Sequence, residues 1–378
     1  MQCKRLAIFF DAINNEIDID VDLIKRLGRA DLTFTPLRGL KTLKYIEQYN
    51  ISSLTYTLLA ILFTVLSPLY FIVKMFQFLP KVGGNITIGS DFEEDLILVA
   101  NGRVEYLYNK VNNIQTGLLL NVNQFDSNKR HSFYQFLSAR DCFSAYFYSV
   151  ISVILFLFNG NKRHHVLQLY VAYEWFLVYA ALSKNKDKFN KVYFANHYDR
   201  WAVMFDRIFE NSNLVLLQHG ILPESLDLRY KLKNLNCIFT LDNASVDIFQ
   251  RMFFCPNTQF KRLDITLPLA HIKNIKQTVL IIGQPNCIQE EIEIAQRIRD
   301  NFDVFVKPHP LYDNTEYRKL KNVIVVTDNK FYPKVNIALC YESTLGVEYE
   351  ASGIPVLWWK GMSCSDVELQ LNSIIKEE

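Results

Sequence analysis

Cysteine is scarce and irregularly placed in this sequence. The 378 residues contain seven cysteines, an odd number, and no two of them form a C-x-x-C pair. The sequence therefore shows neither a zinc knuckle nor the framework of a disulfide-stapled secreted domain. A secretory signal is also missing, because the amino-terminal residues become acidic before a sufficiently long apolar stretch develops. We expect the chain to stay in the reducing cytosol.

An excess of charge of one sign is missing as well. The chain has 41 basic and 39 acidic residues, and its formal net charge is +2. Proteins that bind nucleic acids carry a clearly basic surface, so this balance gives no general case for nucleic acid. The basic runs NKRHH and SKNKDKFNK are local candidates, but such runs are typical of solvated loops. We predict no nucleic-acid partner.

Spacings typical of metal ligands are also lacking. The sequence contains no H-E-x-x-H pair, and no D-x-D pair in a setting that would hold a divalent ion. His164 and His165 are adjacent, so their side chains would point apart. We therefore expect no metal and no resident cofactor. In metal-independent chemistry, cationic side chains and helix dipoles stabilise the leaving group.

A long uncharged stretch is present near the amino terminus. Residues 48–73 contain no charged residue and are long enough to cross a bilayer. Lysines stand on both sides, so the positive-inside rule assigns no orientation, and a segment that dips into one leaflet fits this pattern. We expect 51–73 to attach the protein, as a peripheral or monotopic protein, to the inner face of the plasma membrane. A buried helical hairpin broken at Pro68 is the alternative, and the shorter apolar run 142–158 is expected to be a core helix.

Short apolar strands alternate with helices over most of the remaining chain. Strands that are apolar throughout and separated by helices predict parallel sheets covered on both faces. The alternation begins again after the basic link 271–277. The predicted fold class is therefore α/β, with two doubly wound, Rossmann-like domains at 81–275 and 276–378 facing each other across a cleft. An amino-terminal part, 1–80, carries the apolar helical segment.

Polar residues follow the strands of the second domain at their carboxyl ends, where ligands bind in open parallel sheets. They are Gly283 and Gln284 in one turn, Lys307, His309 and Pro310 in the next loop, and Ser343, Thr344 and Glu348 at the start of a helix. A glycine turn and a helix N-terminus suit an anion, and the lysine and histidine would offset phosphate charge. Glu348 would accept hydrogen bonds from a ribose or a base. Each residue singly also fits a turn, a cap or a first-turn acid.

The first domain offers a candidate general base. His219 stands at the end of the strand 213–220, and a neutral imidazole there could remove the proton of an acceptor hydroxyl. Asp199 is a second candidate, and the acidic turn 89–96 is a third. The structural alternatives are a histidine bonded to nearby backbone, a salt bridge between Asp199 and Arg200, and a solvated turn.

These motifs together resemble those of the metal-independent glycosyltransferases of the GT-B fold that build bacterial surface polysaccharides. The resemblance lies between residues 190 and 360, in QHG, IIGQP, KPHP and STLGVEYEASGIPV. The nearest patterns are those of capsule transferases that use CMP-Kdo, and of bacterial sialyltransferases and polysialyltransferases that use CMP-sialic acid. In these enzymes an HP motif and a serine motif hold cytidine monophosphate. His309 and Pro310 match the first motif, Ser343 and Thr344 the second, and Glu348 the acid of S-x-x-G-x-E.

The resemblance implies an inverting transferase of capsule, lipopolysaccharide or O-antigen synthesis. It would move a sugar, of sialic acid or Kdo type, from a CMP-activated nucleotide donor to a glycan or lipid-linked acceptor. The acceptor would bind to 81–275 and the nucleotide to 276–378, with no other cofactor. QHG is closer to a motif of the teichoic acid glycerophosphotransferases, and the acidic motif that supplies the base in sialyltransferases is missing. A polyol-phosphate transferase with a CDP donor, a UDP-sugar enzyme, and a non-catalytic membrane-attached subunit of a polysaccharide assembly complex therefore stay open.

Overall fold

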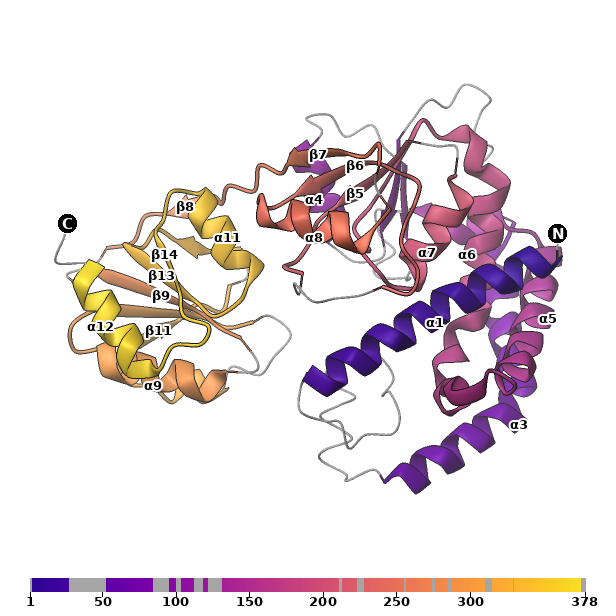
Figure 1. The fold of residues 1–378 in the computed structure, drawn as a ribbon, viewed down its shortest axis with the longest axis horizontal. Coiled ribbons are helices and arrows are strands. Elements are labelled where there is room, and N and C mark those ends of the chain that lie inside the picture. The colour runs from indigo at the N-terminus through magenta and orange to yellow at the C-terminus, as the bar shows by residue number, and fades with distance from the viewer. Residues whose placement is uncertain are drawn as a thin grey trace. The chain divides into compact units, whose positions relative to one another are not determined.

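The computed structural model describes the chain in segments, and it divides into two compact units. The described residues are 2–26, 52–83, 95–99, 103–111, 118–121, 131–210, 213–222, 228–254, 256–273, 276–284, 287–309, 315–328 and 330–374. One unit comprises residues up to 219 together with 223–261, and the other comprises 220–222 together with residues from 262 onwards. Each unit contains a parallel sheet with helices around it (Figure 1). The chain is thus a mixed α/β protein, as the alternation of strands and helices predicts.

The first unit is built on a sheet of seven strands in the order β3-β2-β1-β4-β5-β6-β7. The strands are β1 (Leu96–Val99), β2 (Leu118–Asn121), β3 (His131–Ser132), β4 (Lys191–Phe194), β5 (Asn213–Leu217), β6 (Leu235–Thr240) and β7 (Gln259–Arg262). The pairings from β3 through β6 are parallel. The direction of winding reverses between β1 and β4, and the carboxyl ends of these two strands flank the position where doubly wound sheets bind ligands.

Helices of two kinds complete the first unit. Short helices that connect the strands of the sheet are α4 (Arg103–Val111), α7 (Arg200–Ile208) and α8 (Ala244–Met252). Long helices are α1 (Gln2–Arg26), α3 (Ser53–Phe78), α5 (Ala139–Phe156) and α6 (Ala172–Asn185). The 3-10 helix η1 (Leu79–Lys81) follows α3, η2 (Phe133–Phe136) precedes α5, η3 (Gly160–Val171) joins α5 to α6, and η4 (Lys186–Lys188) follows α6. Helix α1 packs on α7, and α3 packs on α5.

The predicted apolar segment, 51–73, corresponds to α3. Residue 51 itself lies outside the described residues. The helix runs without interruption past Pro68, so the alternative of a hairpin broken there is wrong. Proline lacks the N–H that would bond to the Thr64 carbonyl. The hydroxyl of Ser67 donates to that carbonyl at 3.1 Å instead. This side-chain bond satisfies the acceptor that proline leaves unpaired, which allows the helix to continue.

Helix α1 is held to α7 by a buried ion pair. The carboxylate of Glu16 accepts from Nε of Arg200 at 2.5 Å and from Nη2 at 2.7 Å. The two side chains are 3% and 6% exposed. Breaking such a pair on one side leaves a charge buried without compensation, which costs about 3–5 kcal/mol.

We therefore expect Glu16→Gln to lower the free energy of unfolding by about 3 kcal/mol, measured by urea denaturation. Asp11→Asn is the matched control, because Asp11 also lies on α1 and pairs with Arg207 of α7, but both of these side chains are more than one-third exposed. Exposed pairs contribute at most about 1 kcal/mol. Equal effects of the two substitutions would contradict the assignment of Glu16 as the anchor of α1.

The second unit is built on five parallel strands in the order β11-β10-β9-β13-β14. Its elements are β8 (Leu269–Ala270), β9 (Thr278–Ile282), α9 (Ile288–Ile298), β10 (Asp303–Lys307), α10 (Thr315–Arg318), β11 (Val323–Val325), β12 (Tyr332–Pro333), β13 (Ile337–Cys340), α11 (Thr344–Ala351), β14 (Val356–Trp358) and α12 (Cys364–Ile374). The unit includes β8, which pairs with β12, and its main segment begins at Arg262, ahead of the predicted boundary at 276.

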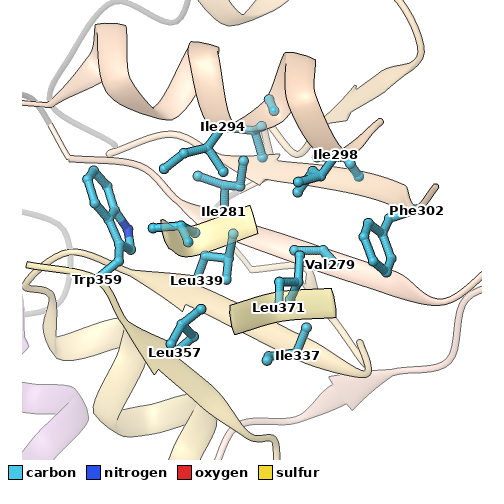
Figure 2. Close-up of a cluster of buried hydrophobic side chains, with 14 of the residues drawn as sticks. Val279, Ile281, Ile294, Ile298, Phe302, Ile337, Leu339, Leu357, Trp359 and Leu371 are labelled. Carbon is cyan, nitrogen blue, oxygen red and sulfur yellow. The ribbon is translucent and has the colours of Figure 1, made fainter. Parts of the chain in front are cut away.

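The sheet of the second unit is covered on both faces. Val279 and Ile281 of β9 belong to one buried cluster, with Ile294 of α9 and Leu371 of α12 (Figure 2). Leu280 and Ile282, which alternate with them along the strand, belong to a second cluster that includes Tyr349 of α11. Side chains that point to opposite faces are both buried, which explains the continuous apolar sequence of this strand. The winding reverses between β9 and β13, as it does between β1 and β4.

Candidate functional site

The loops that follow β9 and β13 are tied together at the switch point of the second sheet. Nε2 of Gln284, after β9, donates to the backbone carbonyl of Glu342, after β13, at 2.7 Å. Ser343 caps helix α11, and its hydroxyl accepts from the amide of Leu345 at 3.3 Å. The structure therefore brings together two of the predicted groups, Gln284 and the pair of Ser343 and half-buried Thr344.

Gly283 joins the loop that follows β10 to these two. Its amide donates to the carbonyl of Lys307 at 2.9 Å. A Cβ atom at this position would lie 2.9 Å from Cα of Pro308, which is closer than packed atoms approach. Glycine is thus required here by the backbone of the neighbouring loop. The sequence interpretation, in which glycine admits a phosphate, is not needed to explain the residue.

Lys307 is directed into the unit. Its Nζ donates to the carbonyls of Asp328 at 2.8 Å and Phe331 at 2.9 Å, and lies 4.8 Å from the ring centroid of Tyr332. Burial lowers the pKa of Lys307. These contacts hold the segment that precedes β12 and account for the lysine without a phosphate.

His309 is half-buried, and burial lowers its pKa, so its imidazole is neutral at pH 7 in the free protein. It would meet a phosphate as a hydrogen-bond donor. Pro310 lies outside the described residues.

Glu348 is 6% exposed and lies one turn inside α11. Gly346, two residues before Glu348, allows α11 to approach the sheet, because a Cβ atom at this position would lie 2.7 Å from Sγ of Cys340.

Glu291 was missed by the sequence analysis and organises the loop after β9. It is 1% exposed and accepts from the amide of Gln284 at 2.8 Å, from Sγ of Cys287 at 3.2 Å, and from the hydroxyl of Tyr317. Burial raises the pKa of its carboxyl to about 7. The available signal was its position on α9, where it shares the buried stripe with Ile294 three residues later.

Two stacked histidines follow β4 and β5 in the first unit. The rings of His197 and His219 have centroids 4.5 Å apart and an interplanar angle of 28°. The amide of His219 donates to Nε2 of His197 at 3.4 Å. Burial lowers the pKa of His197 well below its usual value and that of His219 to about 4, with the charge of Arg103 adding to the latter shift. Both rings are therefore neutral at pH 7.

One nitrogen of His219 is held by the backbone and the other is not. The ring hydrogen-bonds to the backbone of Ala195. Within the described part of the chain, Nδ1 of His219 is buried and has no hydrogen-bond partner. The nitrogen that bonds to the carbonyl must be Nε2 carrying the proton, so Nδ1 presents a lone pair. Oδ1 of Asn196, buried beside Ala195 in the sequence, is likewise without a partner among the described residues.

Asp199, the second candidate base, is the N-cap residue of α7. Its carboxylate accepts from the amides of Trp201 and Ala202 at 3.0 Å each, at the start of α7. Nδ2 of Asn196 donates to its other oxygen at 2.5 Å. The guanidinium of Arg200 pairs with Glu16. Of the third candidate, the turn 89–96, residues 89–94 lie outside the described residues.

No family model matches the sequence, and a search of curated proteins found no significant match. Among the residues that the structure describes, no three His, Cys, Asp or Glu side chains gather as a metal ion would require. The groups suited to chemistry lie at or beside the two switch points. Beside the first, after β5, the ring of His219 is neutral and its Nδ1 has no hydrogen-bond partner among the described residues. At the second, the capped N-terminus of α11 lies next to loops that are hydrogen-bonded to each other.

Proposed function

We propose that the chain is an inverting, metal-independent glycosyltransferase of the GT-B type, in which two doubly wound domains face each other across a cleft. It would act in bacterial surface polysaccharide synthesis and transfer a sugar from a CMP-activated donor to a glycan or lipid-linked acceptor at the cytoplasmic face of the membrane. The observation that carries the proposal is the buried Nδ1 of His219, which has no hydrogen-bond partner within the described part of the chain. A histidine that acts as a general base must be neutral and must have a lone pair available.

In the proposed reaction, Nδ1 of His219 takes the proton of an acceptor hydroxyl while the hydroxyl oxygen attacks the anomeric carbon of the donor. The bond from that carbon to the phosphate oxygen breaks, and CMP leaves with the electron pair. The bond between Nε2 and Ala195 fixes the ring in the required tautomer. Oδ1 of Asn196, which has no hydrogen-bond partner in the described part of the chain, supports the same assignment, because a sugar hydroxyl can donate to it.

The nucleotide is assigned to the switch point of the second unit. The dipole of α11 favours an anion at the N-terminus of the helix, where Ser343 and Thr344 stand. His309, two residues beyond β10, would donate to the phosphate. The bond between Gln284 and Glu342 holds two of the loops in place before the ligand arrives, which lowers the cost of binding.

A thermal-shift screen of CMP, CDP, UDP and GDP tests this assignment. We expect CMP to raise the melting temperature and His309→Ala to lower the affinity for CMP by about tenfold, the value of one hydrogen bond to a charged group. His271→Ala is the matched control, because His271 is an exposed histidine of the same unit. Equal shifts in both variants would remove His309 from the site.

The same screen separates the alternatives. A larger shift with CDP than with CMP would favour a polyol-phosphate transferase, since QHG resembles the histidine-glycine motif of the teichoic acid glycerophosphotransferases. Nucleotide binding without transfer to any glycan or lipid-linked acceptor would favour a non-catalytic subunit of an assembly complex. The absence of a shift with every nucleotide would contradict the donor site itself.

A further inference from the structure

Helices α3 and α5 of the first unit present one shared apolar surface. The two helices pack on each other. They run antiparallel, because Phe78 at the end of α3 contacts Tyr134 just before α5, with ring centroids 5.1 Å apart. Exposed apolar side chains extend from Leu54 to Phe76 on α3, each 45–69% exposed, and from Phe143 to Phe158 on and just after α5, each 38–82% exposed. Soluble monomers rarely expose an apolar area of this extent.

The exposed face of α5 corrects the expectation that 142–158 is a core helix. Among the described residues, three helical stretches are long and apolar enough to cross a membrane, and they differ in how far they are buried inside the protein. The most apolar part of the α3 stretch is 17% buried, that of α5 33%, and that of 162–188 67%. The third stretch therefore belongs to the protein interior, and the first two share the exposed surface.

The opposite face of α3 is built into the protein. Phe71 and Phe78 are buried. Nζ of Lys74 donates to the carboxylate of Glu174 on α6 at 2.7 Å, and the hydroxyl of Tyr70 donates to the carbonyl of Tyr170 at 3.2 Å. A helix that crossed a bilayer would have to give up these contacts. The surface is therefore suited to enter a bilayer from one side, as interfacial helices do to a depth of about 5–10 Å.

The charges around this surface are almost all basic. Residues 52–83 contain no acidic residue, and residues 139–171 contain one, Asp141. Asp141 accepts from Nζ of Lys184 at 2.5 Å. Exposed basic side chains stand at both ends: Lys81 and Arg140 at one, and Arg163 after α5 at the other. A second copy of the chain would set cations against cations, whereas anionic lipid headgroups would be attracted.

We infer that α3 and α5 form a two-helix membrane-binding surface that inserts into one leaflet of an anionic phospholipid bilayer. This inference rests on the membrane location given in the proposed function, and it names the surface that binds the membrane. The apolar side chains supply the insertion, and the basic residues at the ends supply the preference for anionic headgroups. In this arrangement the enzyme meets a lipid-linked acceptor without a membrane span.

Flotation of the full chain with lipid vesicles tests the inference, with vesicles of phosphatidylcholine alone and of phosphatidylcholine mixed equally with phosphatidylglycerol. We expect stronger binding to the mixed vesicles. Phe147→Glu on α5 should lower vesicle binding by about tenfold or more. The matched control is Phe254→Glu, which should bind as the wild type does, because Phe254 is 60% exposed and Phe147 61% exposed in the same unit. Arg140→Glu should reduce binding to the mixed vesicles alone.

Three results would overturn the inference. The first is binding of Phe147→Glu equal to that of the control, which would leave α3 acting by itself. The second is a lipid-independent dimer of the wild type that Phe147→Glu dissociates, which would identify a second copy as the partner. The third is protection of both ends of α3 from opposite sides of a vesicle, which would indicate a span. Vesicle binding is measured without nucleotide, so its failure is distinguishable from failure of the proposed transfer.

Discussion

His219→Gln is expected to lower the kcat of sugar transfer by about 10²–10⁴-fold, the usual contribution of a general base. The amide of glutamine can keep a hydrogen bond to the backbone but has no lone pair that takes a proton at neutral pH. Nucleotide binding should survive, because the proposed donor site lies in the second unit. Initial rates at saturating donor, together with the thermal shift by CMP, separate these two effects.

The comparison for this variant is Asp199→Asn. Asp199 caps α7, and asparagine is a comparable N-cap residue, so this substitution should change stability by less than about 1 kcal/mol and leave kcat unchanged at a temperature where the protein is folded. The pH profile provides a second readout. Since the pKa of His219 is lowered to about 4, kcat/KM of the wild type should stay level around neutrality and fall as the pH approaches 4. Loss of activity in Asp199→Asn with full activity in His219→Gln would reverse the assignment.

The free energy of unfolding is expected to fall steeply as the pH is lowered from 6.5 toward 4. Burial lowers the pKa of His165 and of His219 to about 4, while the unfolded chain takes up these protons near pH 6.5. The unfolded state therefore binds more protons in this window, and stability is lost as the pH falls. The full effect is about 3 kcal/mol for each histidine, at 1.36 kcal/mol per pKa unit. His197 acts in the same sense.

Urea denaturation at pH 7 and pH 5 measures this loss. His165→Gln removes one titrating group and should reduce the difference between the two pH values, whereas His271→Gln, at an exposed site, should not. Glu291 acts in the opposite sense, because its raised pKa makes the folded state bind a proton between pH 7 and 4.5. The comparison of variants separates the histidines from Glu291. An unchanged pH dependence in His165→Gln would show that this ring is not held neutral.

The strands and helices were predictable because their signals are local. The uninterrupted apolar run of β9 predicted a strand buried on both faces, and its residues alternate between two buried clusters. The prediction of parallel α/β sheets is thereby confirmed. The GT-B arrangement, in which two domains face each other across a cleft, remains a prediction.

The candidate site was predictable only in its positions along the chain. Strand ends at Gly283, Lys307 and Ser343 follow from the apolar runs that precede them, and the three loops do lie together. The contacts that each side chain makes there depend on residues from other parts of the sequence. Nζ of Lys307 meets carbonyls 21 and 24 residues away, and the acid that holds the loop after β9 is Glu291 on the next helix.

Local sequence is sufficient to identify the strands and helices, because the periodicity of apolar residues and the turn residues act over a few neighbouring positions. The pairing of charges and the exposure of apolar faces depend on how the chain folds. Glu16 and Arg200 are 184 positions apart, and Lys74 and Glu174 are 100 apart. Side chains so distant in the sequence meet only when the chain has folded, so the polar contacts of α3 and the open apolar face of α5 could not be read from local pattern.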